Sequence, residues 1–260
     1  SKIISSGLLK SIKLKNGSDN KYNLIIVCTG NKSNIVKSFS HNEIYNSPYN
    51  EISITTILQH TALQNNITRQ IFLKEGVVAF LPISNSRTSI VWSIKKNIFN
   101  KHKGKKNLYF KNKIKFFAKK FIKNAQIVSS IEYKDLNLLI RKKYYQDRIL
   151  LFGDALHEVH NLAGQGFNMT IRDLINLEKI LKSKISLGLD IGSSDILDEF
   201  SNLMKPRNFI YSIGIDLIKN FFSSKNNFLK NSRTQIITQI NKNNFIKDQF
   251  INFADEGLKF

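Results

Sequence analysis

The sequence contains one cysteine, Cys28, and no run of apolar residues long enough to cross a membrane. A single cysteine excludes a framework of internal disulfide bonds. Because Cys28 follows the apolar run NLIIV, we expect it to be an inert thiol in the core. A spanning helix needs about 18 consecutive apolar residues, and a signal peptide needs a basic start, an apolar middle and a cleavage site. Neither pattern is visible, so we expect neither feature.

Acidic residues are also scarce: 19 Asp and Glu stand against 40 Lys and Arg, which gives a net charge of +21 at pH 7. One interpretation is a nucleic-acid or anionic membrane partner. The other is codon bias, because AT-rich codons give abundant lysine, asparagine and isoleucine, with the charge spread over a solvated surface. The lysines are dispersed, apart from KHKGKK at 101–106. With no RNA- or DNA-binding motif, we predict no nucleic-acid partner, and a weak attraction to acidic lipid head groups stays open.

The histidines do not form a metal-binding pattern. His157 and His160 lie three residues apart, but no Cys or His cluster accompanies them. We predict structural roles for both and no metal site.

Periodicity and turn residues divide the chain into strands and helices. Residues 10–15 and 22–29 read as strands joined by the turn NGSDN, and the second, a continuous apolar run, predicts a strand covered on both faces. Residues 50–96 are β-branched and predict an antiparallel sheet of at least three strands. Further strands are expected at 126–139 and 148–152, and amphipathic helices at 111–124, 165–182 and 200–226, the last with Phe209, Ile213, Leu217 and Phe221 at intervals of four.

The stretch RILLFGDALHEVHNLAGQGFN, residues 148–168, combines a short strand, a carboxylate and a glycine-containing helix start. Asp154 follows the strand ILLFG. At the carboxyl end of a parallel strand, an aspartate faces the crevice in which α/β sheets bind ligands, and it can accept hydrogen bonds from ribityl or ribose hydroxyls. The alternative is an aspartate that caps a helical turn at ALHEVH. Spacing alone does not decide between the two.

The segment LAGQGFN, residues 162–168, opens the next predicted helix. Gly164 and Gly166 leave backbone N–H groups without a covering side chain. The first turn of a helix has unpaired N–H groups and a positive dipole end. This combination predicts a pocket for an anion, either a phosphate or negative charge that develops on a ring.

Taken together, GDALHEVHNLAGQGFNMTIRD (Gly153–Asp173) resembles the second FAD-binding motif of flavin-dependent aromatic hydroxylases. That motif has a Gly-Asp pair, then Ala-x-His, then Gly-Gln-Gly-x-Asn and an Arg-Asp pair. The dipeptide Val159–His160 before the glycines is similar to the ubiquinone-biosynthesis branch. The resemblance extends more faintly to RQIFLKEGVVAFLPI and SIVWSI, which look like substrate-domain strands, and to NLIIVCTGNKSNIV, which looks like the segment with the family's Asp-Gly motif.

The resemblance implies an α/β (α+β) fold of the p-hydroxybenzoate hydroxylase type. A partial FAD-binding domain would comprise residues 1–37 and 144–186, an antiparallel substrate-binding sheet residues 38–143, and a helical region residues 187–260. It also implies FAD as cofactor, NAD(P)H as reductant, O2, and hydroxylation of a polyprenylated phenol in ubiquinone biosynthesis. The implied cofactor-binding residues are Gly153, Asp154, Leu162, Ala163, Gly164, Gln165, Gly166, Phe167 and Asn168. No general base is identified.

The chain departs from the family pattern at several positions. Thr29–Gly30 stands where the family has Asp-Gly, and Val36, followed by Lys37, stands where an arginine is expected. Both positions are linked to the cofactor and the nicotinamide. Prolines are replaced by Asn161 and by Lys134, and Leu156 replaces an alanine.

The family's N-terminal Gly-x-Gly-x-x-Gly segment, which binds the ADP half of FAD, has no counterpart among these residues. We therefore expect the chain to correspond to the C-terminal two thirds of the family, with weak FAD binding. The alternative function is a degenerate flavoprotein remnant that acts as a non-enzymatic scaffold in a quinone-synthesis complex. We expect a bacterial, cytoplasmic protein that can lie at the periphery of the inner membrane.

Overall fold

The computed structural model describes residues 2–6, 9–13, 19–39, 43–102, 104, 106–223 and short stretches between 235 and 248. Its largest sheet has seven strands, in the order β13-β10-β5-β8-β7-β6, with β9 paired to β5. All pairings in this sheet are antiparallel, as predicted. The strands are β5 (Glu43–Gln59), β6 (Arg69–Leu73), β7 (Gly76–Ser84), β8 (Arg87–Lys95), β9 (Gln126–Ile127), β10 (Glu132–Arg141) and β13 (His157–Glu158). The predicted strand at 126–139 is thus two strands, β9 and β10.

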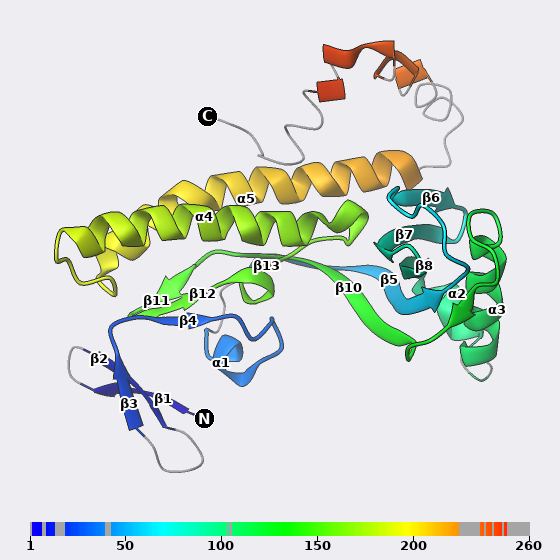
Figure 1. The fold of residues 1–260 in the computed structure, drawn as a ribbon. Helices are drawn as coiled ribbons and strands as arrows, with labels where there is room; N and C mark the ends of the chain where they lie inside the picture. Colours follow the sequence, from blue (N-terminus) through cyan, green and yellow to red (C-terminus); the bar gives the residue numbers. More distant parts are fainter. Residues whose placement is uncertain are drawn as a thin grey trace.

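Helices α2 (Lys96–Lys101) and α3 (Lys106–Ala118) lie beside β6, β7 and β8 (Figure 1). Helix α3 begins before the predicted range of 111–124 and ends earlier, at Ala118, where the chain turns. Its predicted apolar stripe does face the core, because Ile114 and Phe117 are buried with Trp92 of β8. The rings of Phe110 and Phe117 stand edge-on to Trp92, with centroids 5.6 Å and 5.2 Å away.

A smaller sheet brings two distant segments together. Strand β12 (Ile149–Leu151) pairs in parallel with β4 (Ile25–Val27) and antiparallel with β11 (Tyr145–Gln146). Leu150 and Leu151 are fully buried, so the predicted short buried strand is confirmed. The prediction that β4 is covered on both faces is wrong, because Ile26 is 42% exposed. Cys28 lies on the same outward side, two residues on, and is exposed rather than part of the core.

The N-terminal strands form a third, antiparallel sheet in the order β1-β2-β3. They are β1 (Lys2–Ser6), β2 (Leu9–Lys13) and β3 (Asp19–Tyr22). Strand β2 pairs with β3. The apolar run at 25–27, which belongs to the strand predicted after the turn, pairs with β12 in the smaller sheet instead. The first residues of the predicted turn, 16–18, lie outside the described residues. A short helix, α1 (Asn34–Lys37), follows β4, and the Ser33 hydroxyl accepts a hydrogen bond from the Val36 N–H at its start.

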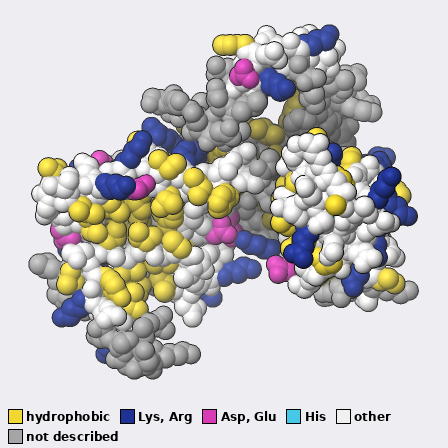
Figure 2. All heavy atoms as spheres, in the orientation of Figure 1, with side chains coloured by type: hydrophobic (Ala, Val, Ile, Leu, Met, Phe, Trp, Pro, Cys, Tyr) yellow, Lys and Arg dark blue, Asp and Glu magenta, His cyan; other side chains and the backbone are white. Residues whose placement is uncertain are grey.

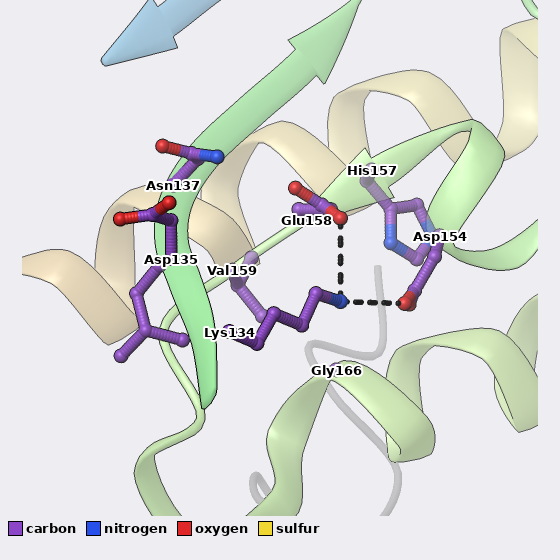
Figure 3. A pocket seen from close by; sticks show the side chains of 9 residues that line it. Lys134, Asp135, Asn137, Asp154, His157, Glu158, Val159 and Gly166 are labelled. Atoms are coloured by element: carbon purple, nitrogen blue, oxygen red, sulfur yellow. Dashed lines mark hydrogen bonds and ion pairs between the residues drawn. The ribbon is translucent and has the colours of Figure 1, made fainter. Parts of the chain in front are cut away.

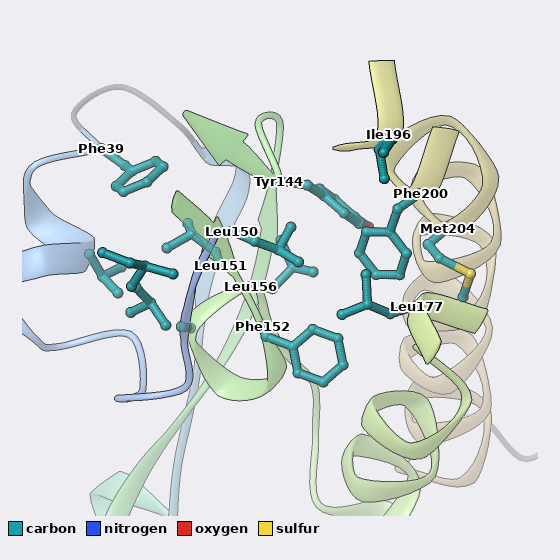
Figure 4. Packing of buried hydrophobic residues seen from close by; sticks show 14 of the residues in the cluster. Phe39, Tyr144, Leu150, Leu151, Phe152, Leu156, Leu177, Ile196, Phe200 and Met204 are labelled. Carbon is teal, nitrogen blue, oxygen red and sulfur yellow. The ribbon is translucent and has the colours of Figure 1, made fainter. Parts of the chain in front are cut away.

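Two long helices lie side by side along one side of the molecule: α4 (Gln165–Ser186) and α5 (Ser194–Ser223) (Figure 1). Figure 4 shows Leu177 of α4 and Phe200 and Met204 of α5 packed against Phe152 and the strand β12. The predicted stripe of α5 does not face the core: Phe209 is 41% and Leu217 63% exposed, and the buried face carries Phe200, Met204, Tyr211 and Ile215 instead. The predicted end of this helix, residues 224–226, lies outside the described residues.

Helix α4 also has an apolar side that the described residues leave exposed. Phe167, Ile171, Leu174 and Ile175 are between 38% and 71% exposed. Figure 2 shows hydrophobic side chains gathered on the half of the molecule that contains α4, with Lys and Arg side chains scattered around them. Within the described part of the chain, no helix combines the length and hydropathy that a membrane span requires.

Candidate functional site

Asp154 lies just beyond the parallel pair of strands β4 and β12. The chain leaves β12 at Leu151 and enters a 3-10 turn, Gly153–Ala155, in which Gly153 has a φ of +60°. This left-handed angle favours glycine. The side chain of Asp154 is 60% exposed. The alternative of a helix cap is wrong, because the residues that follow are strand β13 rather than a helix, and the Asp154 carboxylate bonds to a lysine instead.

Helix α4 starts without a capping side chain. A 3-10 turn, Leu162–Gly164, precedes it, and Gly164 has a φ of +71° and makes no side-chain cap hydrogen bond. The first-turn N–H groups of the helix therefore have no partner from the cap. A Cβ built on Gly164 would meet no heavy atom within 4 Å, so the approach to this helix start is open.

Asp154 and Gly166 at the start of α4 line one pocket of about 60 Å³, to which strands β10 and β13 also contribute residues. Figure 3 shows Gly166 on one side of it and the Asp154 side chain on another. The remaining lining residues are Lys134, Asp135, Leu136, Asn137, His157, Glu158 and Val159. A second pocket, of about 190 Å³, shares Asp135, Leu136 and Asn137 and extends to Lys32, Pro48, Asn50, Glu51 and Lys96.

A β-bulge shapes the boundary between the two pockets. The pairing of β10 with β5 shifts register between Leu136 and Asn137, so Tyr49 and Asn50 have no partner in the ladder. Asn50 has a φ of +53°. Bulges of this kind redirect side chains next to binding sites. Here the bulge lies where the sheet meets the pocket that contains Asp154.

A lysine and two carboxylates dominate the electrostatics of the smaller pocket. The Lys134 ammonium lies 3.3 Å from Asp154 Oδ2 and 3.5 Å from Glu158 Oε1 (Figure 3). Asn31 Nδ2 donates to Glu158 Oε2 at 2.6 Å. Burial raises the pKa of Glu158, an effect that Lys134 partly offsets. Burial would lower the pKa of Lys134, but the charges of Glu158 and Asp154 raise it on balance.

Buried polar contacts fix the backbone of the motif behind this pocket. His157 Nε2 lies 2.9 Å from Asp173 Oδ2, and Asn208 of α5 donates to both oxygens of Asp173 at 3.1 Å. The side chains of His157 and Asp173 are 3% and 0% exposed. Arg141 Nε donates to the Ala155 carbonyl at 2.7 Å. These contacts agree with the structural role predicted for His157.

His160 is also held in the interior. Its Nε2 lies 2.9 Å from Glu51 Oε2, and the Lys219 ammonium lies 3.1 Å from Glu51 Oε1. The side chain of His160 is 1% exposed. His160 thus joins the motif to β5 and α5, as expected of a structural residue.

Residues 18–207 match the family model described as an FAD binding domain, so the match covers most of the chain and the entire motif. The chain belongs to this family. The resemblance to FAD-dependent aromatic hydroxylases is thereby confirmed. Similarity to their ubiquinone-biosynthesis branch comes from the named relatives described next.

Relatives with assigned names agree with this. The chain is 25% identical to human mitochondrial ubiquinone biosynthesis monooxygenase COQ6, over 94% of this chain and 59% of the human protein. It is 26% identical to ubiquinone hydroxylase UbiL of Rhodospirillum rubrum, over 82% of this chain and 50% of that protein. The chain therefore spans only 50–59% of the length of these two relatives.

Solved structures give the fold. The p-nitrophenol 4-monooxygenase PnpA of Pseudomonas putida superposes with a TM-score of 0.74 at 11% identity, over 99% of this chain and 66% of that chain. The FAD-dependent monooxygenase PqsL of Pseudomonas aeruginosa, described as probable, gives 0.62 at 16% identity over 82% of this chain and 60% of that chain. The predicted fold of the p-hydroxybenzoate hydroxylase type is confirmed.

Within this FAD-binding fold, the predicted cofactor residues do not all face the pocket. Asp154 and Gly166 line it. Leu162 is buried against Met169 and Tyr211, and Gln165 accepts a hydrogen bond from the Tyr211 hydroxyl. Phe167 is 71% exposed, and the side chain of Ala163 lies outside the described residues. Gly153, Gly164 and Asn168 are absent from the pocket lining.

The Asp-Gly region of the family differs here in its contacts as well as its sequence. Thr29 donates a hydrogen bond to the Ser33 hydroxyl at 2.7 Å. Val36 is 2% exposed and packs in the core, so this position offers no charge to a ligand, whereas Lys37 next to it is exposed.

The polar groups around the pocket are of the types that bind a flavin nucleotide. An exposed carboxylate can accept hydroxyl hydrogen bonds, an ammonium can bind phosphate, and an uncapped helix start favours negative charge. The volume of about 60 Å³ holds roughly two water molecules. A flavin would therefore extend beyond this pocket, with the described residues forming one wall of its site. Among the described residues, no group of three or more His, Cys, Asp or Glu side chains could hold a metal ion.

Proposed function

We propose that this chain forms the greater part of an FAD-dependent monooxygenase. It would hydroxylate the aromatic ring of a polyprenylated phenol in ubiquinone biosynthesis, with NAD(P)H as reductant and O2 as oxidant. The observation that carries the proposal is the pocket shared by Asp154 and the start of α4, at the carboxyl end of the parallel pair β4–β12. The family match and the names of the relatives support the same function.

The residues have separate tasks in this proposal. Asp154 accepts hydrogen bonds from hydroxyl groups of the ribityl chain. The uncapped start of α4, with the backbone of residues 164–168, stabilises negative charge on the reduced ring. FAD, when bound, supplies the reaction with O2. The chain orients cofactor and phenol and excludes water from them.

We extend the proposal to the organisation of the chain. Residues 1–37 and 144–186 contribute to the FAD-binding domain, and residues 38–143 form the substrate-binding sheet. The predicted helical region, residues 187–260, contains α5, and most of residues 224–260 lie outside the described residues. The exposed apolar side of α4 and the net charge of +21 suit contact with acidic lipid, which would give access to a polyprenylated substrate. We place the protein in a bacterial cytoplasm, at the inner membrane, where it could join a quinone-synthesis complex.

Flavin binding by Asp154 variants tests the site. The purified chain is titrated with FAD and with riboflavin, and bound flavin is measured by equilibrium dialysis. Asp154→Ala should weaken both ligands about tenfold, because both carry the ribityl hydroxyls and each loses a hydrogen bond to a charged group. Asp135→Ala is the matched control: its carboxylate lines the same pocket but is bound to Lys96 at 2.7 Å.

Catalysis is tested separately. The chain is incubated with FAD, NADH or NADPH and a prenylated phenol, and hydroxylated product is measured by mass spectrometry. Growth of a ubiquinone-deficient bacterium that carries the gene supports the same conclusion, provided that Asp154→Ala abolishes it. If the chain binds no flavin and still restores growth, the scaffold function replaces this proposal.

A further inference from the structure

Lys134 is a cation at a position where the resembled family has a proline. It is the third residue of β10, and its side chain is 61% exposed. Its ammonium points into the pocket between Asp154 and Glu158 (Figure 3). A proline at this position could supply neither charge nor a hydrogen-bond donor, so Lys134 gives this chain a contact that the family pattern lacks.

The charges around the pocket show what Lys134 changes. Of the charged residues in the described lining, Lys134 is positive and Asp135, Asp154 and Glu158 are negative. Lys96 neutralises Asp135 from the adjoining pocket, at 2.7 Å. Without Lys134, the two remaining carboxylates would repel a phosphate group. With it, the pocket presents an ammonium beside the carboxylate that we assign to the ribityl chain.

The ammonium has capacity for a further partner. A lysine has three N–H donors, and the two carboxylate contacts, at 3.3 Å and 3.5 Å, are long for charge-assisted bonds. Glu158 holds the ammonium in place, because its other oxygen accepts a hydrogen bond from Asn31. The flexible, exposed stem of Lys134 lets the ammonium shift without disturbing β10.

We propose that Lys134 is an additional cofactor-binding residue whose ammonium contacts the phosphate part of FAD, while Asp154 binds the ribityl chain. Glu158 is a positioning residue that keeps the ammonium beside Asp154. This inference rests on the proposed function, since it assumes that the pocket receives FAD.

Affinities for FAD and riboflavin, which lacks phosphate, test the assignment. Lys134→Met should weaken FAD binding about tenfold, the loss expected of one charge-assisted hydrogen bond, while riboflavin binding does not fall. Lys134→Arg, which keeps the charge, should retain most of the FAD affinity. Added salt should weaken FAD binding to the unaltered chain more than to Lys134→Met. Lys113→Met is the control, because it removes a lysine of α3 that is paired with Glu75, away from the pocket.

Each other result overturns the assignment. If FAD affinity is unchanged in Lys134→Met, Lys134 does not contact the phosphates, and the proposed function still stands. If FAD and riboflavin weaken equally, Lys134 only holds Asp154 and Glu158 in place. If Lys134→Met fails to fold, Lys134→Gln, which also removes the charge, takes its place in the same comparisons. If the unaltered chain binds neither flavin, the proposed function fails together with this inference.

Discussion

The core beneath the large sheet and the segment from Gly153 to Asp173 are stabilised by different forces. Between the sheet and α3, the buried cluster consists of aliphatic and aromatic side chains around Trp92. The motif segment instead buries His157, His160 and Asp173, each with a polar partner on another element. An apolar core tolerates substitutions that keep its total side-chain volume and hydrophobic pattern. A buried polar network instead requires each hydrogen-bonding partner at a defined position. The second kind of stabilisation is the one that orients the pocket.

The largest effect is expected in the apolar region. Phe117→Ala should lower the free energy of unfolding by about 3–5 kcal/mol, because it opens a cavity beside Trp92. Phe116→Ala is a neighbouring control on the same helix, with a side chain that is 59% exposed. Its cost should stay below about 1 kcal/mol. Urea denaturation measures both, and equal costs would contradict the description of this core.

The second prediction concerns the polar network. Asp173→Asn should cost about 2–3 kcal/mol, because His157 and Asn208 lose the carboxylate that both contact. Glu178→Gln, on the exposed side of the same helix, should change the unfolding midpoint very little. A neutral outcome for Asp173→Asn would mean that the motif does not depend on this buried carboxylate.

The smallest expected effect is a stability loss on substitution of Glu51, and it should depend on pH. Burial alone would raise the pKa of Glu51, but the hydrogen bond from His160 and the charge of Lys219 lower it below the ordinary 4.5. A depressed folded-state pKa stabilises the fold above the unfolded value, and this contribution is lost as the pH falls through the folded value. Glu51→Gln should therefore cost about 1–2 kcal/mol at pH 7.

The cost of Glu51→Gln should disappear in acid, where the native carboxyl group is also protonated. Thermal unfolding across the acidic range measures this convergence. A gap between the two proteins that persists at low pH would show that the charge of Glu51 is not its source. Glu199→Gln, which removes a more exposed carboxylate paired with Lys184, is the control.

Local patterns predicted the sheet, the parallel strand β12 and the start of α4, because β-branched runs, turn residues and glycines act over a few positions. They did not predict which side of a helix is covered: Phe209 and Leu217 have helical spacing yet are exposed. A stripe indicates an amphipathic helix, but its neighbours decide which side is buried. Ile25 and Val27 are buried whereas Ile26 between them is exposed, so only one face of β4 is covered by other elements, and the length of an apolar run does not show this.

The site was predicted in part for the same reason. Asp154 and the glycines are contiguous in the motif, so the sequence could indicate them together. The contacts of Lys134 with Asp154 and of Asn31 with Glu158 join residues 20 and 127 positions apart, and no local pattern contains them. The lysine in place of a proline was the one available signal for the first contact, and the second had none.

Strand β10 has a mechanical consequence for the whole molecule. It pairs with β5 from Glu132 to Arg141 and carries Lys134, and on its other edge Leu139 and Ile140 pair with β13, which follows the Asp154 turn. If the sheet tilted, the Lys134 ammonium and the Asp154 carboxylate would therefore move with it. A movement that separated β13 and the Asp154 turn from β10 would first have to break the Leu139–Glu158 and Ile140–His157 pairs. A movement of the large sheet is therefore transmitted to the pocket through the continuous backbone of β10.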